Sequence, residues 1–160
     1  MTFVLYLITD PSASDVVEAT RAALCAAPPG AVAVQARAKG ASARELVALA
    51  AALAPVCRAR SAPLFVNDRA DVAKVVGADG VHLPEEGLSV AEARAVLGPR
   101  ALFGRSCHDR AGLEEAQRAG RASPRSRPSA RCPARARRSA SRAWRRRCGA
   151  SPSTSTRSAA

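Results

Sequence analysis

Two cations, Arg37 and Lys39, stand two residues apart at the end of an apolar stretch of the sequence. In an extended segment, residues two apart project to the same side, so both side chains would face one ligand. Arginine binds two oxygens of a phosphate at once, and lysine adds a point charge. The pair therefore predicts a phosphate or diphosphate site. The alternative is that both residues are solvated surface charges before Gly40.

An amide, a carboxylate and a guanidinium stand in a row at Asn67, Asp68 and Arg69, directly after the apolar run Leu64–Val66. Asp68 suits a hard Mg²⁺ ion that bridges the protein to phosphate oxygens. The alternative is structural, because Asp68 or Asp71 suits the N-cap of a following helix. The sequence therefore predicts either a metal ligand or a helix cap at this point.

Histidines accompany two further apolar stretches. His82 lies inside one of them, where a histidine is usually a hydrogen-bonded core residue. Ser106, Cys107 and His108 end another, and the last two suggest a nucleophile and its base. Adjacent residues of a strand point to opposite faces, so Cys107 and His108 do not easily form such a pair.

Five apolar stretches alternate with longer, alanine-rich helical segments. Nearly continuous apolar content is typical of parallel strands covered on both faces. We expect strands at Phe3–Thr9, Ala31–Arg37, Leu64–Asn67, Gly80–Leu83 and Ala101–Ser106. This pattern predicts an α/β fold of about five βα units, as a doubly wound open sheet or as an incomplete (β/α)₈ TIM barrel. In both architectures ligands bind where the strands end.

Helix signals lie between these stretches. Ser42 with Glu45, and Ser89 with Glu92, have the spacing of capping boxes. Pro55 falls inside the segment that begins at Ser42, and it should kink or shorten that helix.

The formal net charge of +12 comes from the end of the chain. Residues 1–120 hold 13 Lys and Arg against 13 Asp and Glu, whereas residues 121–160 hold 12 Arg and no acid. The second segment has no Val, Ile, Leu, Met or Phe, so it cannot bury enough apolar surface to order itself. We predict a globular body over 1–120 and a disordered Arg/Ser/Pro-rich tail over 121–160.

A basic tail raises the alternative of a nucleic-acid-binding protein. Against it, the body has no net charge, and Trp144 alone is no platform for stacking bases. The sequence also lacks the roughly 20 consecutive apolar residues of a membrane span. Five cysteines without a CxxC spacing or a secretory signal indicate free thiols in a reducing cytoplasm.

Four stretches occur in an order and spacing that resembles the thiamine phosphate synthase and TenI family. They are LYLITD, VQARAKG, the long block from Pro63 to Gly98, and FGRSCH. The resemblance implies a (β/α)₈ barrel and a transferase of thiamine biosynthesis. Such an enzyme joins 4-amino-5-hydroxymethyl-2-methylpyrimidine diphosphate to thiazole phosphate and releases pyrophosphate. Its partners are therefore small phosphorylated pyrimidine and thiazole substrates.

The resemblance also implies roles for single residues. It makes Asp68 a ligand of the cofactor Mg²⁺, which with the cations would neutralise the charge on the departing pyrophosphate. It assigns substrate binding to Gln35, Arg37, Lys39, Asn67 and Ser106.

Two stretches depart from the family pattern. Gly87 stands where synthases carry a second Mg²⁺ ligand, and Glu86 is a possible replacement from the next position. The stretch GRSCH is closer to the corresponding motif of TenI-type thiazole tautomerases, in which His108 would be the acid/base. The four residues Arg37, Lys39, Asn67 and Asp68 favour the synthase.

After Gly120 the family pattern ends. Residues 121–160 contain none of the later strands and Gly-rich phosphate loops that the family implies. Arg, Ser, Pro and Ala have GC-rich codons, so we interpret this segment as the product of a frameshift near residue 120. A chain of this kind is predicted to be unstable and inactive, because its sheet would keep two unpaired edges.

Overall fold

The computed structural model describes residues 3–11 and 15–107, together with Gly112, Glu114 and Arg118. His108 and the predicted basic tail lie outside these residues. Among the described residues, no helix is long and apolar enough to cross a membrane.

Five parallel strands form one sheet whose spatial order, β1-β2-β3-β4-β5, is the order of the sequence. All five predicted strands are confirmed, and two of them have the predicted bounds. The strands are β1 (Leu5–Ile8), β2 (Val32–Ala36), β3 (Leu64–Asn67), β4 (Gly80–Leu83) and β5 (Leu102–Arg105).

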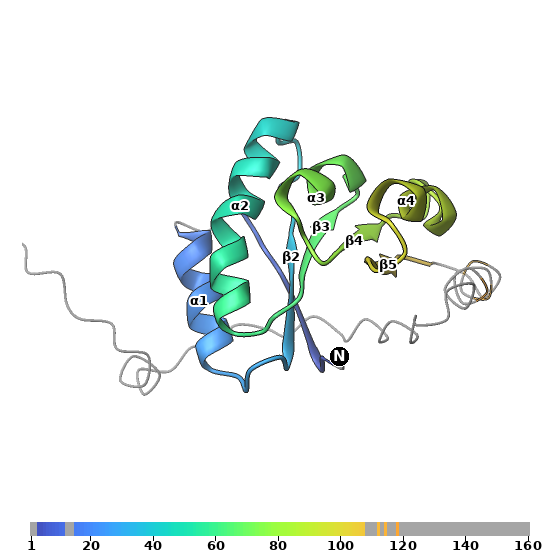
Figure 1. Ribbon diagram of the computed structural model, residues 1–160. Helices are drawn as coiled ribbons and strands as arrows, with labels where there is room; N and C mark the ends of the chain where they lie inside the picture. Colours follow the sequence, from blue (N-terminus) through green and yellow to red (C-terminus); the bar gives the residue numbers. More distant parts are fainter. Residues whose placement is uncertain (1–2, 12–14, 108–111, 113, 115–117, 119–160) are drawn as a thin grey trace, which may run out of the picture.

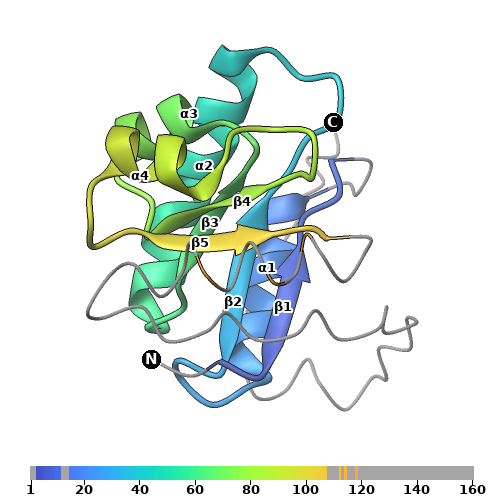
Figure 2. The same cartoon turned by 90° about the vertical axis from the view of Figure 1, so that its right-hand side faces the viewer.

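Four helices connect the strands and pack side by side on one face of the sheet (Figures 1 and 2). A doubly wound sheet would reverse its strand order and carry helices on both faces. Sequential order with one helical layer is instead the winding of a barrel, so the described residues form a half-barrel. The helices are α1 (Val16–Cys25), α2 (Ala43–Ala59), α3 (Ala70–Val76) and α4 (Val90–Leu97).

The two faces of the sheet have different residues because side chains alternate along each strand. On the face toward the helices, small and branched apolar side chains such as Val34, Val66, Val81 and Leu83 are fully buried and form the core. The opposite face carries aromatic and polar side chains. We call this second surface the inner face, and its members include Tyr6, Gln35, Phe65, Asn67, His82 and Ser106.

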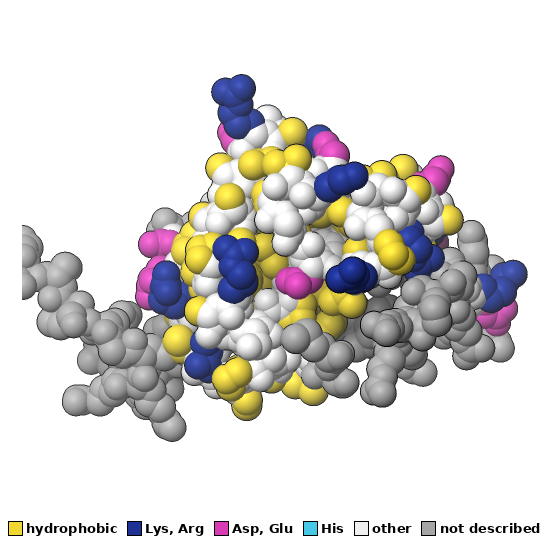
Figure 3. All heavy atoms as spheres, in the orientation of Figure 1, with side chains coloured by type: hydrophobic (Ala, Val, Ile, Leu, Met, Phe, Trp, Pro, Cys, Tyr) yellow, Lys and Arg dark blue, Asp and Glu magenta, His cyan; other side chains and the backbone are white. Residues whose placement is uncertain are grey.

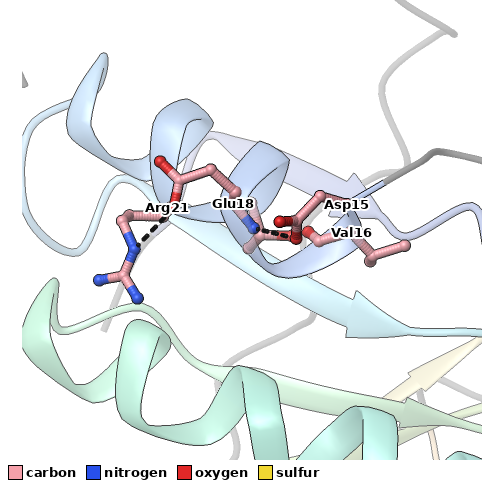
Figure 4. A network of polar contacts seen from close by, with 5 residues as sticks. Asp15, Val16, Glu18 and Arg21 are labelled. Carbon is pink, nitrogen blue, oxygen red and sulfur yellow. Dashed lines mark hydrogen bonds and ion pairs between the residues drawn. The ribbon is translucent and has the colours of Figure 1, made fainter. Parts of the chain in front are cut away.

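Local hydrogen bonds begin three of the helices. The capping boxes of α2 and α4 are confirmed, since Ser42 and Ser89 each exchange hydrogen bonds with the glutamate three residues later. Asp15 begins α1 by accepting from the Glu18 N–H at 2.9 Å, and Arg21 pairs with Glu18 one turn further on (Figure 4). The capping hydrogen bonds of Ser42, Ser89 and Asp15 satisfy backbone donors that a helix start leaves without partners.

The prediction that Pro55 shortens its helix is wrong. α2 continues through Pro55 as one helix of 17 residues. Proline removes the hydrogen bond to the carbonyl four residues earlier, here that of Ala51. Both Pro55 and Ala51 are exposed, so this carbonyl can be hydrated.

Charged side chains are dispersed over the helices. On the face shown in Figure 3, the Lys and Arg side chains of the described residues lie singly among acidic and apolar ones. This part of the molecule therefore presents no continuous basic surface there, in agreement with the charge balance of residues 1–120.

Candidate functional site

The carboxyl ends of β2 and β3 are joined by a side-chain hydrogen bond on the inner face. Gln35 donates from Nε2 to Oδ1 of Asn67 at 3.1 Å. Gln35 is only 1% exposed, whereas Asn67 is half-buried at the end of its strand. The buried amide thus fixes the orientation of Asn67, and the Asn67 amide group is turned so that its N–H₂ donors are left for other partners.

Arg37 is held at the same edge by Thr9, the residue after β1. The Arg37 N–H donates to the Thr9 hydroxyl at 2.9 Å, and that hydroxyl donates to the Arg37 carbonyl at 3.0 Å. The Nε atom of Arg37 is buried and has no hydrogen-bond partner among the described residues. Since a buried donor without an acceptor is costly, this N–H is suited to an anionic ligand.

Lys39 is placed differently from the prediction. β2 ends at Ala36, and Lys39 lies exposed in the following turn. The extended geometry that would align it with Arg37 therefore does not reach this residue. The interpretation as a solvated charge describes Lys39 in this structure, but it is wrong for Arg37, whose Nε is buried.

Asp68 begins the loop after β3 with a left-handed backbone, at φ 64°. Its N–H donates to the His82 carbonyl of the neighbouring strand at 2.8 Å, which holds this conformation. The N-cap residue of α3 is Arg69, so neither Asp68 nor Asp71 is the helix cap that the alternative required. The Asp68 side chain is exposed at the strand end and is available to a ligand.

Arg69 is engaged by Asp71 rather than by the edge of the sheet. Its guanidinium forms two hydrogen bonds to that carboxylate, one from Nε at 2.9 Å and one from a terminal nitrogen. The side-chain hydrogen bond from Arg69 lowers the pKa of Asp71 to about 2. Of the three polar residues in a row, only Asn67 and Asp68 therefore remain for ligand chemistry.

His82 and Ser106 connect β4 to the end of β5 on the inner face. Nε2 of His82 lies 3.0 Å from the Ser106 hydroxyl oxygen, and Tyr6 packs near the imidazole with 5.9 Å between ring centroids. Burial and then the charge of Arg37 lower the pKa of His82, so the ring is neutral at pH 7. The prediction of a hydrogen-bonded histidine is confirmed.

Gly87 lies beside the Asp68 carboxylate. A Cβ atom added to Gly87 would stand 3.0 Å from Oδ1 of Asp68 and 2.8 Å from the Pro84 ring. Glu86, the possible replacement ligand, has an exposed side chain. In the described part of the chain no three His, Cys, Asp or Glu side chains are grouped to hold a metal ion.

Two contributors to this site have no signal in the sequence. Thr9 acts through its position next to β2, and Gly104 acts through its missing side chain, since a Cβ there would lie 2.7 Å from Nδ1 of His82. Both depend on contacts between strands. His108, predicted as the acid/base of a tautomerase, lies outside the described residues.

Sequential parallel strands and one helical layer define the (β/α)-barrel class, whose members bind ligands at the carboxyl edge of the sheet, and side chains suited to phosphate lie at that edge here. Comparisons with known proteins give the family. A family model described as thiamine monophosphate synthase matches residues 5–123. The chain therefore belongs to this family.

Individual relatives agree with the family match. The chain is 40% identical over 121 residues to a thiamine-phosphate synthase of Roseiflexus castenholzii and 43% identical over 112 residues to one of Gloeobacter violaceus, which is 74% and 70% of this chain. A solved thiamine phosphate pyrophosphorylase from Pyrococcus furiosus aligns with a TM-score of 0.65 and 37% identity, over 72% of this chain.

The match covers only part of each relative. It spans 50% of the Roseiflexus protein, 32% of the Gloeobacter protein and 55% of the Pyrococcus structure. The chain thus spans about half or less of the length of these relatives.

Proposed function

We propose that this chain carries the diphosphate-binding half of a thiamine-phosphate synthase site. The substrate would be a hydroxymethylpyrimidine diphosphate, which loses pyrophosphate as a thiazole phosphate becomes attached. The observation that carries the proposal is the buried Nε of Arg37 at the carboxyl edge of the sheet, which has no hydrogen-bond partner among the described residues. Family membership supplies the substrate class.

Each residue of the site has a proposed role. Arg37 donates to the diphosphate, and the exposed Lys39 adds charge from the neighbouring turn. Asn67 binds the substrate with the amide group that Gln35 orients. Ser106 contacts the diphosphate through its hydroxyl group. Fixed donors aimed at a leaving group stabilise the negative charge that develops on it.

The site suits a magnesium ion that the protein and the substrate would bind together. Mg²⁺ is often held by one or two carboxylates, with water and substrate phosphates completing its coordination. The exposed Asp68 carboxylate supplies one such oxygen ligand beside Gly87. When bound, the ion would neutralise diphosphate charge. Asp68 is the protein ligand we propose, with Glu86 as the further candidate.

Binding of Mg²⁺ and inorganic pyrophosphate by the 160-residue chain tests this proposal. Isothermal titration should give saturable binding that Arg37→Gln weakens about tenfold or more, because a hydrogen bond to a charged group is lost. Arg100→Gln is the matched control, since it removes one exposed positive charge at the opposite edge. Equal loss in both variants, or no binding by the parent chain, would contradict the proposal.

The complete reaction is a separate question. We predict that the purified chain forms no thiamine phosphate from the two substrates, because it matches only about half of each relative. Product formation above a protein-free control would contradict this prediction. Pyrophosphate binding without product formation would locate the loss outside the diphosphate site.

We also propose a cytoplasmic location. Cys25 and Cys57 are free thiols in the structure, as a reducing compartment favours. Fractionation of cells that express the chain should recover it with cytoplasmic markers, and recovery with secreted proteins would contradict the proposal.

A further inference from the structure

His82 makes two contacts that reach two different parts of the proposed diphosphate site. Its carbonyl accepts the N–H of Asp68 at 2.8 Å, and its Nε2 atom lies 3.0 Å from the Ser106 hydroxyl oxygen. The strand register explains this arrangement, because β4 lies between β3 and β5 and His82 is paired with Asn67 on one side and Gly104 on the other. One residue therefore spans both strand ends.

The position of the imidazole depends on Gly104. A Cβ atom at this position would lie 2.7 Å from Nδ1 of His82, so only glycine leaves the ring its present place. Tyr6 packs near the same ring, with an angle of 40° between the ring planes. The ring is thus confined between a glycine and an aromatic side chain, and Nε2 is directed at Ser106.

We propose that His82 is a positioning residue that donates from Nε2–H to Ser106 and so turns the serine hydroxyl toward the diphosphate. The inference rests on the proposed function of the site. A serine hydroxyl has one hydrogen, and it cannot give this hydrogen to histidine and to an anion together. If Nε2 carries a proton and donates, the Ser106 hydrogen is free for a phosphate oxygen. The opposite tautomer would consume it.

Ring nitrogen NMR tests the hydrogen bond without any ligand. Long-range ¹H–¹⁵N spectra should show His82 protonated at Nε2, with the assignment made from His82→Gln. Ser106→Ala should shift the Nε2 resonance, because it removes the acceptor. A proton on Nδ1 in the parent chain, or an Nε2 resonance that Ser106→Ala leaves unchanged, would overturn the inference.

A double-mutant cycle tests whether the histidine acts through the serine. We expect Ser106→Ala and His82→Phe each to weaken pyrophosphate binding in the presence of Mg²⁺ about tenfold, since each removes the oriented hydroxyl donor. The double variant should bind no more weakly than Ser106→Ala alone. His82→Gln retains an amide donor near the Nε2 position and should restore most of the affinity. Additive losses would show that His82 acts independently of Ser106.

A further variant keeps the test valid if His82→Phe does not fold. Gly104→Ala leaves His82 in place but forces its ring away from Ser106, so it should also weaken binding, and only while Ser106 is present.

The outcomes separate the proposed role of His82 from the proposed function of the site. A parent chain that binds no pyrophosphate overturns both of them. Binding that Arg37→Gln weakens but both His82→Phe and Gly104→Ala leave unchanged overturns only the role of His82.

Discussion

At the edge where the strands begin, polar side chains bind the backbone of the chain itself, whereas at the edge where the strands end Arg37 has a buried donor without a partner in the described part of the chain. Arg60 donates to the carbonyls of Leu24 and Ala27, and Asp79 accepts the Leu64 N–H at 2.8 Å. At the other edge, Arg37 has no partner for Nε among the described residues. Arg60 and Arg37 therefore differ in whether the described chain supplies acceptors for their donors.

The backbone differs between the two edges in a related way. Among the residues that the structure describes, each edge has one residue other than glycine with a positive φ, Ser61 where β3 begins and Asp68 where it ends. Ser61 belongs to a tight turn after α2, with its N–H bonded to the Arg58 carbonyl at 3.1 Å. Asp68 instead presents a carboxylate beside Gly87. The two positions thus share a backbone conformation and differ in the chemistry of their side chains.

The largest expected effect on stability is that of replacing Arg60, and replacing Arg37 should not have it. Arg60→Ala should lower the free energy of unfolding by about 3 kcal/mol, because two carbonyls at the end of α1 lose a charged donor. Arg37→Ala should leave it unchanged or raise it slightly, since it removes a buried donor that no described residue satisfies. Urea denaturation measures both values. A larger loss for Arg37→Ala would remove the distinction between the two edges.

Asp79 offers a second, smaller test at the edge where the strands begin. Asp79→Ala should cost about 1 kcal/mol, because the Leu64 N–H loses its acceptor and Leu64 is only 3% exposed. Asp79→Asn keeps an acceptor oxygen and should cost less than half of this amount. Pyrophosphate binding should be the same in both variants, and a change in affinity would show that this residue also affects the other edge.

The two residues with positive φ provide a matched pair. Asp68→Gly and Ser61→Gly should each stabilise the chain by up to about 0.5–1 kcal/mol, because glycine adopts this conformation without a Cβ penalty. Only Asp68→Gly should weaken pyrophosphate binding in the presence of Mg²⁺, since it removes the proposed metal ligand. Equal affinities of the two variants would argue against a metal role for Asp68.

The sequence was sufficient for most of the fold because the fold depends on local patterns. Apolar runs predicted all five strands, and the spacing of Ser42 and Glu45 predicted a capping box that the structure contains. The predicted shortening of α2 at Pro55 was wrong, because the cost of the proline depends on whether the freed carbonyl meets water. The choice between an open sheet and a barrel needed the strand order, which no single segment specifies.

The candidate site was predictable only as a set of strand ends. Residues Arg37, Asn67 and Asp68 lie at the same edge because parallel strands all end there. The contact between His82 and Ser106 was not predicted, since it requires the register of β4 and β5 and the missing side chain of Gly104. Strand register is a tertiary property, so the residue types alone could not reveal this pair.

The smallest expected effect is on the reactivity of Cys57, which tests how well the thiol is buried near the edge where the strands begin. Burial, and then the charge of Asp79, raise the pKa of the Cys57 thiol to about 11. The thiol therefore stays protonated at pH 8, and iodoacetamide should label it far more slowly than Cys25, which is less buried. Peptide mapping by mass spectrometry measures the two rates.

The raised pKa of Cys57 also makes the stability of the chain depend on pH. The pKa of Cys57 in the folded chain lies above its ordinary value of 9.0. The contribution of this thiol to the free energy of unfolding is therefore complete below pH 9 and is lost as the pH rises toward 11. The difference in unfolding free energy between the parent chain and Cys57→Ala should shrink over this range. Asp79→Asn should speed labelling of Cys57, because it removes a negative charge that opposes the thiolate. Unchanged labelling in Asp79→Asn would leave burial as the whole cause of the raised pKa.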